Sequence, residues 1–278
     1  MMILKEPGEI NNNHGDVAKT ISFELDIIGR PTRFSICVAQ KQARLSDITP
    51  LARMLSTKLA IIVLDKLHSN GEFVPCRKGC SACCNYLIPL SVPETFRLRE
   101  VLAMPTEQGR AVSQSFLDTA KIILNEKSKK FEINESAETS CQIQINQLSK
   151  WYASLKLACP FLSNNLCTSY EHRPIACREH IVTDSALLCD DERSDESQIV
   201  QIPISILHCL GQMTAELEQS DIEAVMLPLA LPWVQENLER GERTWSAVTM
   251  VECFVEILQA LNIEQSKART TKIPQLCS

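Results

Sequence analysis

The distribution of cysteine constrains this chain more than any other feature. There are 13 cysteines, and nine of them fall between Cys76 and Cys189. The first residues, MMILKEPGEINNN, lack the basic and then apolar order of a secretory signal, so we expect a cytoplasmic protein. In that reducing compartment, clustered cysteines serve as metal ligands or redox centres rather than as a disulfide framework. The sequence therefore predicts a metal or redox site in the middle of the chain.

Composition and charge exclude several other classes of protein. Of the 278 residues, 45% are hydrophobic and 22% are charged, which is typical of a globular chain. The formal charge of −6 is the opposite of what a general binder of nucleic acid or of anionic membranes needs. No apolar run reaches the roughly 20 residues of a membrane helix. We therefore expect no nucleic-acid and no membrane partner, while a protein partner stays open.

Local patterns predict one short sheet and many helices. Apolar residues occupy alternate positions in 21–27 and 34–38, with Gly29-Arg30-Pro31 between them, which predicts a β-hairpin. Beyond it, Ser46 is a candidate N-cap, and Ser91 with Glu94 forms a capping box. The expected helices cover residues 46–70, 91–104, 106–130, a stretch around 148–155, 203–218, 221–240 (bent by Pro228 and Pro232) and 244–262.

The expected fold is mainly α, a helical scaffold with a small N-terminal β-hairpin and two cysteine-rich metal-binding loops. We divide the chain into a mobile tail (1–18), the hairpin and first helix (19–74), a cysteine-cluster metal-binding module (75–190), C-terminal helices packed on that module (191–265) and a second tail (266–278).

The first cysteine-rich loop, residues 75–90, places four thiols within nine residues as Cys-x3-Cys-x2-Cys-Cys. Thiolates are strong ligands for zinc and for iron–sulfur clusters. Gly79 permits a backbone bend that lets the neighbouring sulfurs converge. Adjacent side chains such as Cys83 and Cys84 usually point apart. These two residues therefore serve two metals, or one binds a metal while the other packs or does redox chemistry.

The second loop, residues 158–190, contributes Cys159, Cys167, Cys177 and Cys189. Asn164-Asn165 is typical of a tight turn, which would bring Cys159 and Cys167 together. Arg173-Pro174 ends any helix there and directs Cys177 back toward them. About 75 residues separate the two loops, and we expect them to form halves of one site.

Together, the two loops resemble the bacterial cysteine-cluster family of zinc- or iron-chelating domains. That family is defined by Cys-x3-Cys-x2-Cys-Cys followed by Cys-Pro-x-Leu, a short turn, Cys-x-x-Tyr, Arg-Pro and Cys-Arg. The match covers roughly residues 75–190, at Cys76, Cys80, Cys83, Cys84, Cys159, Pro160, Leu162, Cys167, Tyr170, Arg173, Pro174, Cys177 and Arg178. Members often add a cysteine about ten residues downstream, where this chain has Cys189. The resemblance implies metal chelation without a shared reaction. A related flagellin lysine methylase carries a similar cluster, but no separate motif here carries methylation across.

The candidate metal ligands are Cys76, Cys80, Cys83, Cys84, Cys159, Cys167, Cys177 and Cys189. They suit two four-thiolate sites, or one site with spare redox thiols. Structural zinc favours pairs of Cys-x2–4-Cys, whereas iron–sulfur sites favour a short run of cysteines plus a remote one. The adjacent Cys83-Cys84 pair is less usual for zinc, so an iron–sulfur cluster is favoured and zinc is the alternative. His172 and His180 lie close enough in sequence to replace a thiol, but with eight cysteines available each is expected to be a polar surface residue or one that hydrogen-bonds to a ligand.

Four thiolates around Zn²⁺ or a [4Fe–4S]²⁺ core leave each site with a charge of −2. The basic residues beside the ligands, Arg77, Lys78, Arg173 and Arg178, either offset that charge or pair with Glu171, Glu179 or the acidic run 190–196.

The spacing Cys76-x3-Cys80-x2-Cys83 is also that of radical S-adenosylmethionine enzymes. The helical surroundings, Ala82 and the additional Cys84 argue against that class. No catalytic residue is identified. Two functions remain. One is a metalloprotein with a redox or enzymatic role on an unknown substrate. The other is a non-enzymatic zinc module that acts as a structural, metal-carrier or interaction protein.

Overall fold

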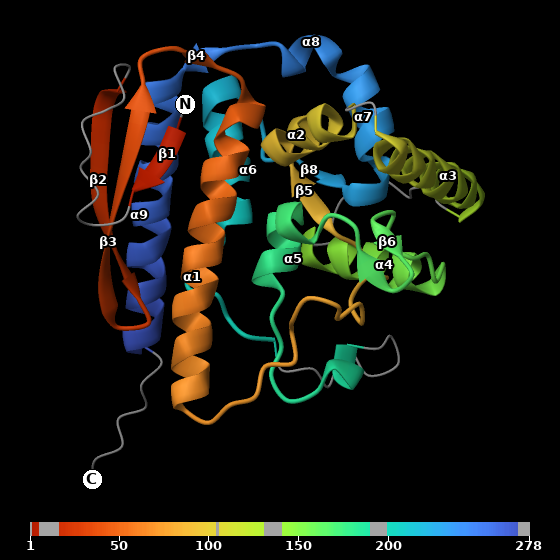
Figure 1. Cartoon of the computed structure of the whole chain (residues 1–278), viewed down its shortest axis with the longest axis horizontal. Helices are drawn as coiled ribbons and strands as arrows, with labels where there is room; N and C mark the ends of the chain where they lie inside the picture. Colours follow the sequence, from red (N-terminus) through yellow and green to blue (C-terminus); the bar gives the residue numbers. More distant parts are fainter. Residues whose placement is uncertain (1, 6–16, 104–105, 131–140, 190–198, 272–278) are drawn as a thin grey trace.

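In its described parts the chain is mainly helical, with a small sheet at its N-terminal side. The computed structural model describes residues 2–5, 17–103, 106–130, 141–189 and 199–271. Within these residues it contains nine α-helices, several short 3-10 turns and a three-stranded sheet (Figure 1). The predicted fold class is confirmed.

The N-terminal sheet is built on the predicted hairpin. β2 (Val17–Ile27) and β3 (Arg30–Ala39) pair antiparallel, with Ile27 opposite Arg30. The connecting Ile28 and Gly29 both have positive φ, 56° and 77°, as the tight turns that match the strand twist require. β1 (Met2–Lys5) pairs with the other edge of β3. Residues 2–5 and 17–18 therefore belong to strands, although the sequence places them in a tail, and residues 6–16 lie outside the described part.

Most expected helices are present, with small shifts at their ends. α1 (Thr49–Ser69) follows a 3-10 turn (Leu45–Ile48), so Ser46 is not its N-cap and instead donates a 2.7 Å hydrogen bond to Glu100. α2 (Val92–Leu102) begins with the predicted capping box. The other predicted helices that the structure contains are α3 (Glu107–Lys130), α4 (Cys141–Ser154), α6 (Ile206–Glu218) and α9 (Ala247–Thr271). α9 includes residues 266–271, and the rest of the expected C-terminal tail is outside the described residues.

The single bent helix expected over 221–240 is wrong. This segment instead consists of β8 (Ala224–Met226), a 3-10 turn (Leu227–Leu229), α7 (Ala230–Glu236) and α8 (Leu238–Gly241). A proline has no N–H and clashes with the carbonyl four residues earlier, so it is tolerated only in the first turn of a helix. Pro228 and Pro232 each lie in the first turn of a separate short helix. Two prolines four residues apart therefore end the helix rather than bend it.

Two short strand pairs join distant parts of the chain. β5 (Pro89–Ser91) pairs with β8, and β4 (Gln42–Ala43) pairs with β9 (Trp245–Ser246). These pairs fix the C-terminal segments onto the N-terminal half.

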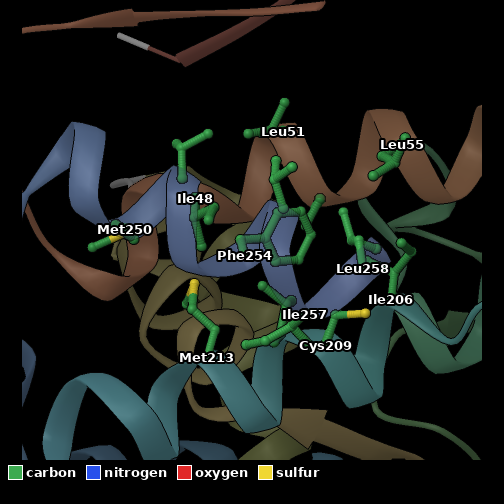
Figure 2. Packing of buried hydrophobic residues seen from close by; sticks show 14 of the residues in the cluster. Ile48, Leu51, Leu55, Ile206, Cys209, Met213, Met250, Phe254, Ile257 and Leu258 are labelled. Atoms are coloured by element: carbon green, nitrogen blue, oxygen red, sulfur yellow. The ribbon is translucent and has the colours of Figure 1, made fainter. Parts of the chain in front are cut away.

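The main hydrophobic core lies between the sheet and α1, α6 and α9. Figure 2 shows Phe254 of α9 between Leu51 of α1 and Met213 of α6. All three side chains are fully buried. Burial of this apolar surface is the main stabilising contribution to the fold.

A second, smaller core lies under the cysteine-rich loops. It is formed by α2, α3, β5 and the segment around Phe161, with Phe116 and Phe161 in an edge-to-face contact at 5.1 Å. Tyr86, Cys159, Cys167 and Cys177 pack against this core. The loops that carry the thiols therefore pack against a hydrophobic core that is separate from the main core.

None of the helices in the described residues combines the length and the apolar character needed to cross a membrane.

Phe254 provides a test of the main core. Replacing it with Ala removes a side chain that is 0% exposed, and we expect a loss of about 3–5 kcal/mol in the free energy of unfolding. The matched control is Phe73→Ala, because the Phe73 side chain is 60% exposed and its loss should change stability by less than about 0.5 kcal/mol. Urea titrations followed by circular dichroism measure both, and equal losses would contradict the assignment of this core.

Candidate metal centre

Successive tight turns shape the first cysteine-rich loop. The Cys80 amide donates to the carbonyl of Arg77 at 3.0 Å, and the Cys84 amide donates to the carbonyl of Ser81 at 3.0 Å. Within the first of these turns, Gly79 has a φ of +93°, an angle that residues with a side chain rarely adopt. A Cβ atom at this position would meet only Leu166 Cδ2, at 3.9 Å. Glycine is therefore required by the backbone angle and not by a lack of space.

A small hairpin shapes the second loop, as the Asn-Asn turn predicts. β6 (Leu162–Ser163) and β7 (Leu166–Cys167) pair around Asn164 and Asn165, which have φ values of 50° and 59°. The Leu162 amide donates to the carbonyl of Cys159 at 2.8 Å. The hairpin therefore returns Cys167 toward Cys159.

Cys177 lies on α5 (Ile175–Glu179), a helix of five residues that follows Arg173-Pro174. So short a helix is not stable alone. A carboxylate holds each end, that of the buried Glu94 and that of the half-buried Glu179. Glu94 of α2 accepts a 2.8 Å hydrogen bond from the first amide of α5, that of Ile175. Glu179 at the other end accepts from the Ile206 amide at 2.6 Å and the Ser205 hydroxyl at 2.8 Å, at the start of α6.

Burial of these two carboxylates shifts their titration. It raises the pKa of Glu94 above its usual range and raises the pKa of Glu179 to about 7, while the hydrogen bonds that each accepts favour the charged form. Sequence reasoning identified Glu94 only as a capping residue and missed the role of Glu179. Nothing in the local pattern of Cys-Arg-Glu indicates that Glu179 binds α6, although Ser205 is a typical N-cap residue before that helix.

The two loops are joined directly through the backbone. The Cys159 amide donates to the carbonyl of Cys84 at 2.6 Å. The Tyr86 hydroxyl donates to the carbonyl of Cys189 at 2.8 Å, which brings the end of the second loop to the first. The structure thus places the loops side by side, as expected from their sequence.

The thiols of Cys76, Cys80, Cys83 and Cys189 are neighbours, and we name them the first thiol group. Burial raises the pKa of Cys83 to about 11, and the charges of Cys189, Cys76 and Cys80 add to this effect. Burial also raises the pKa of Cys189, with Cys76 and Cys80 as its charged neighbours. Electrostatic coupling of this kind requires proximity, so the remote Cys189 lies near the thiols of the first loop.

The thiols of Cys84, Cys159, Cys167 and Cys177 form the second thiol group. Burial raises the pKa of Cys84 to about 12. The charges of Cys159, Cys83, Cys167 and Cys80 also raise the pKa of Cys84. Burial likewise raises the pKa of Cys159 to about 12 and that of Cys177 well above its usual range, with Cys159 its first charged neighbour. The charge of Cys83 also acts on Cys84, Cys159 and Cys177, so the two groups meet at the consecutive residues Cys83 and Cys84.

Among the described residues, no three Cys, His, Asp or Glu side chains already enclose a position for a metal ion. The thiols are neighbours without forming a finished coordination shell. Their chemistry nevertheless suits zinc or iron, because both metals bind clusters of four thiolates. Metal sites rarely exist fully formed before the metal binds.

The basic residues divide between the two roles expected of them. Arg173 favours the charged thiolates, because its charge lowers the pKa of Cys76 and Cys177 against the effect of burial. Lys78 instead forms an exposed ion pair with Glu171 at 3.0 Å. Arg178 donates to Thr57 of α1 at 2.7 Å and to the carbonyl of Arg173 at 3.2 Å, so it ties α5 to α1. The expected pairing of Glu179 with an arginine is replaced by its bonds to α6. The acidic run 190–196 lies outside the described residues.

The two histidines near the thiols differ. His172 is exposed, whereas His180 is half-buried and its buried Nε2 atom has no hydrogen-bond partner. Burial lowers the pKa of His180, and its ring contacts Tyr86 edge-on at 5.6 Å. The other cysteines of the described part lie elsewhere. Cys37 and Cys209 are buried in apolar surroundings, and the partly buried Cys253 donates to Glu216 at 3.3 Å. The side chain of Cys141 and all of Cys277 are outside the described part.

Comparison with known proteins identifies the cysteine-rich part of the chain. Residues 75–196 match the model of the CxxCxxCC family, whose description is "Putative zinc- or iron-chelating domain". The match covers less than half of the chain and includes all eight clustered cysteines. No curated protein and no solved structure matches this chain.

The carboxylate at the end of α5 provides a test of how the site is held. Glu179→Ala leaves the Ile206 amide and the Ser205 hydroxyl without an acceptor, and we expect a loss of about 2–3 kcal/mol in the free energy of unfolding. Glu242→Ala is the control, because that side chain is 68% exposed. Thermal unfolding compares the two variants with the parent chain. An equal, small effect of both substitutions would contradict the proposed fixation of α5.

Proposed function

Since residues 75–196 match the model of the CxxCxxCC family, described as a "Putative zinc- or iron-chelating domain", we propose that this chain binds two iron–sulfur clusters, one in each thiol group. We further propose that it uses them in redox or enzymatic work on a substrate still to be identified. The observation that supports the proposal is that the eight thiols are neighbours around the consecutive Cys83 and Cys84, and we divide them into two groups of four.

The composition of the first thiol group favours iron–sulfur over zinc. Three of its cysteines, Cys76, Cys80 and Cys83, come from one short run, and the fourth, Cys189, comes from a distant segment. A short run with one remote cysteine is typical of iron–sulfur ligation. Assigning Cys83 and Cys84 to different groups also removes the difficulty that adjacent side chains rarely converge on one metal.

The second thiol group is held by three separate structural devices. Cys84 lies in the successive turns of the first loop. The β6–β7 hairpin brings Cys167 back toward Cys159. Cys177 is fixed by the two carboxylates at the ends of α5. A tetrathiolate set of this kind accepts either metal, so here the preference for iron rests on analogy with the first group. The side chains have to rotate on metal binding to complete the shell, because no three of them already enclose a metal position in the described residues.

Charge compensation also supports two thiolate sites. Each occupied site carries a charge of −2, and in this chain Arg173 acts on thiols of both groups through Cys76 and Cys177. An iron–sulfur cluster would supply one-electron transfer when bound. The residues of the chain would hold it, exclude water through the second core and balance its charge.

Elemental analysis of the anaerobically purified chain distinguishes the metals. Two four-iron clusters predict about eight iron atoms per chain with little zinc, and a broad visible absorption that bleaches on reduction. One or two zinc atoms without iron or colour would contradict the iron–sulfur assignment and support a non-enzymatic zinc module. Absence of both metals would contradict metal chelation altogether.

Single substitutions test the division into two groups. Cys80→Ser and Cys167→Ser each remove a ligand of one group only, so we expect each to lose roughly half of the bound metal, and the double variant to lose nearly all. Cys253→Ser is the matched control. Cys253 lies on α9, far along the chain from either group, so this variant should keep the full complement of metal.

Metal per chain and circular dichroism are measured on the same samples, so that loss of metal is separated from loss of fold. Complete loss of metal in either single variant would show one shared site rather than two. Retention of the full complement in Cys80→Ser would contradict the ligand assignment of the first loop.

A further inference from the structure

A cavity of about 190 Å³ lies between α1 and α5, beside the thiols of Cys76 and Cys177. Figure 1 shows these two helices next to one another. The cavity is smaller than the roughly 300–1,000 Å³ of pockets that hold cofactors and drug-sized molecules. It has room for a ligand of only a few heavy atoms.

One side of the cavity is lined by three nitrogen-rich side chains, those of Arg173, Arg178 and His180. The Nε atom of Arg173 and the Nε2 atom of His180 are both buried, and neither has a hydrogen-bond partner. Buried polar atoms are nearly always paired, so two unpaired ones at a single cavity call for a ligand that pairs them. None of the described residues that line the cavity is acidic.

These side chains are already held in place. The Arg173 guanidinium stacks on the ring of Tyr170, with its central carbon 4.5 Å from the ring centroid. Arg178 is oriented by its bonds to Thr57 and to the carbonyl of Arg173. The ring of His180 contacts Tyr86 edge-on. A ligand would therefore find its donors oriented in advance, which lowers the entropy lost on binding.

Apolar side chains also line the cavity, those of Ala60, Ile61 and Leu64 of α1 and of Ile181. A ligand that fills the whole space thus combines one anionic group with a short hydrocarbon part. A carboxylate presents two oxygens in the plane that guanidinium groups match. Inorganic phosphate lacks the hydrocarbon part and would leave the apolar side unfilled.

We propose that this cavity binds a small aliphatic carboxylate, with its charged group on Arg173, Arg178 and His180 and its hydrocarbon end against Ala60, Leu64 and Ile181. The assignment rests on the proposed metal-binding function, because it makes this molecule a substrate or effector presented beside the thiols. Arg173 then has two roles, since it faces both the ligand and the thiolates.

The test uses the full metal-loaded chain and radiolabelled butyrate in equilibrium dialysis. We expect one butyrate site per chain, with butanamide (the uncharged isostere) and inorganic phosphate competing at least ten-fold more weakly. Arg173→Met should weaken butyrate binding at least ten-fold, because it keeps the stem and removes the charge. The control is Arg33→Met, which removes an equal charge from a side chain that is 84% exposed on β3 and should leave binding unchanged.

A second variant, Ala60→Leu, fills the cavity from α1 without altering a charge or a thiol, and it should also weaken butyrate binding at least ten-fold. The proposal is overturned if butyrate does not bind the parent chain, if butanamide competes equally well, or if Ala60→Leu leaves binding unchanged. Metal content is read on every sample. A parent chain that contains no metal and still binds butyrate would refute the metal function and support the cavity assignment. A parent chain that contains metal and does not bind butyrate would support the metal function and refute the cavity assignment.

Discussion

The fixation of α5 by two carboxylates, the buried Glu94 and the half-buried Glu179, is the interaction on which the cysteine-rich part depends. Glu94 and Glu179 each bind backbone amides that begin a helix, where the helix dipole favours negative charge. A five-residue helix could not otherwise hold Cys177 in one place. Through these bonds, the position of one thiol is determined by α2 and α6, which are distant in sequence. Arg178 adds a third fixation, to α1.

The two hydrophobic cores differ in whether clustered cysteines pack against them. The core between the sheet, α1, α6 and α9 contains no clustered cysteine, so it can stabilise the fold without metal. The smaller core has Cys159, Cys167 and Cys177 at its edge. Burial raises the pKa of Cys159 and of Cys177, so these two thiols are neutral when no metal is bound. The second core is thus the part of the molecule whose stability would change most on metal binding, because binding energy and folding energy are coupled there.

Local sequence signals predicted the parts of the structure that local interactions determine. The hairpin around Gly29, the capping box at Ser91 and the Asn164-Asn165 turn follow from residues next to one another, and all three are confirmed. Features that depend on distant partners were missed. The third strand, the pairing of β5 with β8 and the role of Glu179 each require a contact with a segment far along the chain. The same limit applies to the site. The eight cysteines can be named from their spacing, but their grouping depends on the approach of Cys189 to the first loop, which the bond from Tyr86 records.

The bond between Glu179 and the first turn of α6 has a consequence for the order of synthesis. On the ribosome, Cys76 to Cys84 emerge early, and the cysteines of the second loop follow about 75 residues later. Cys177 cannot be held at its place until Ile206 and Leu207 have also emerged, because their amides bind Glu179. A nascent chain therefore exposes reactive thiols for some time before its second thiol group can form. In the proposed metal-binding role, the second thiol group can therefore be completed only after the first turn of α6 has emerged.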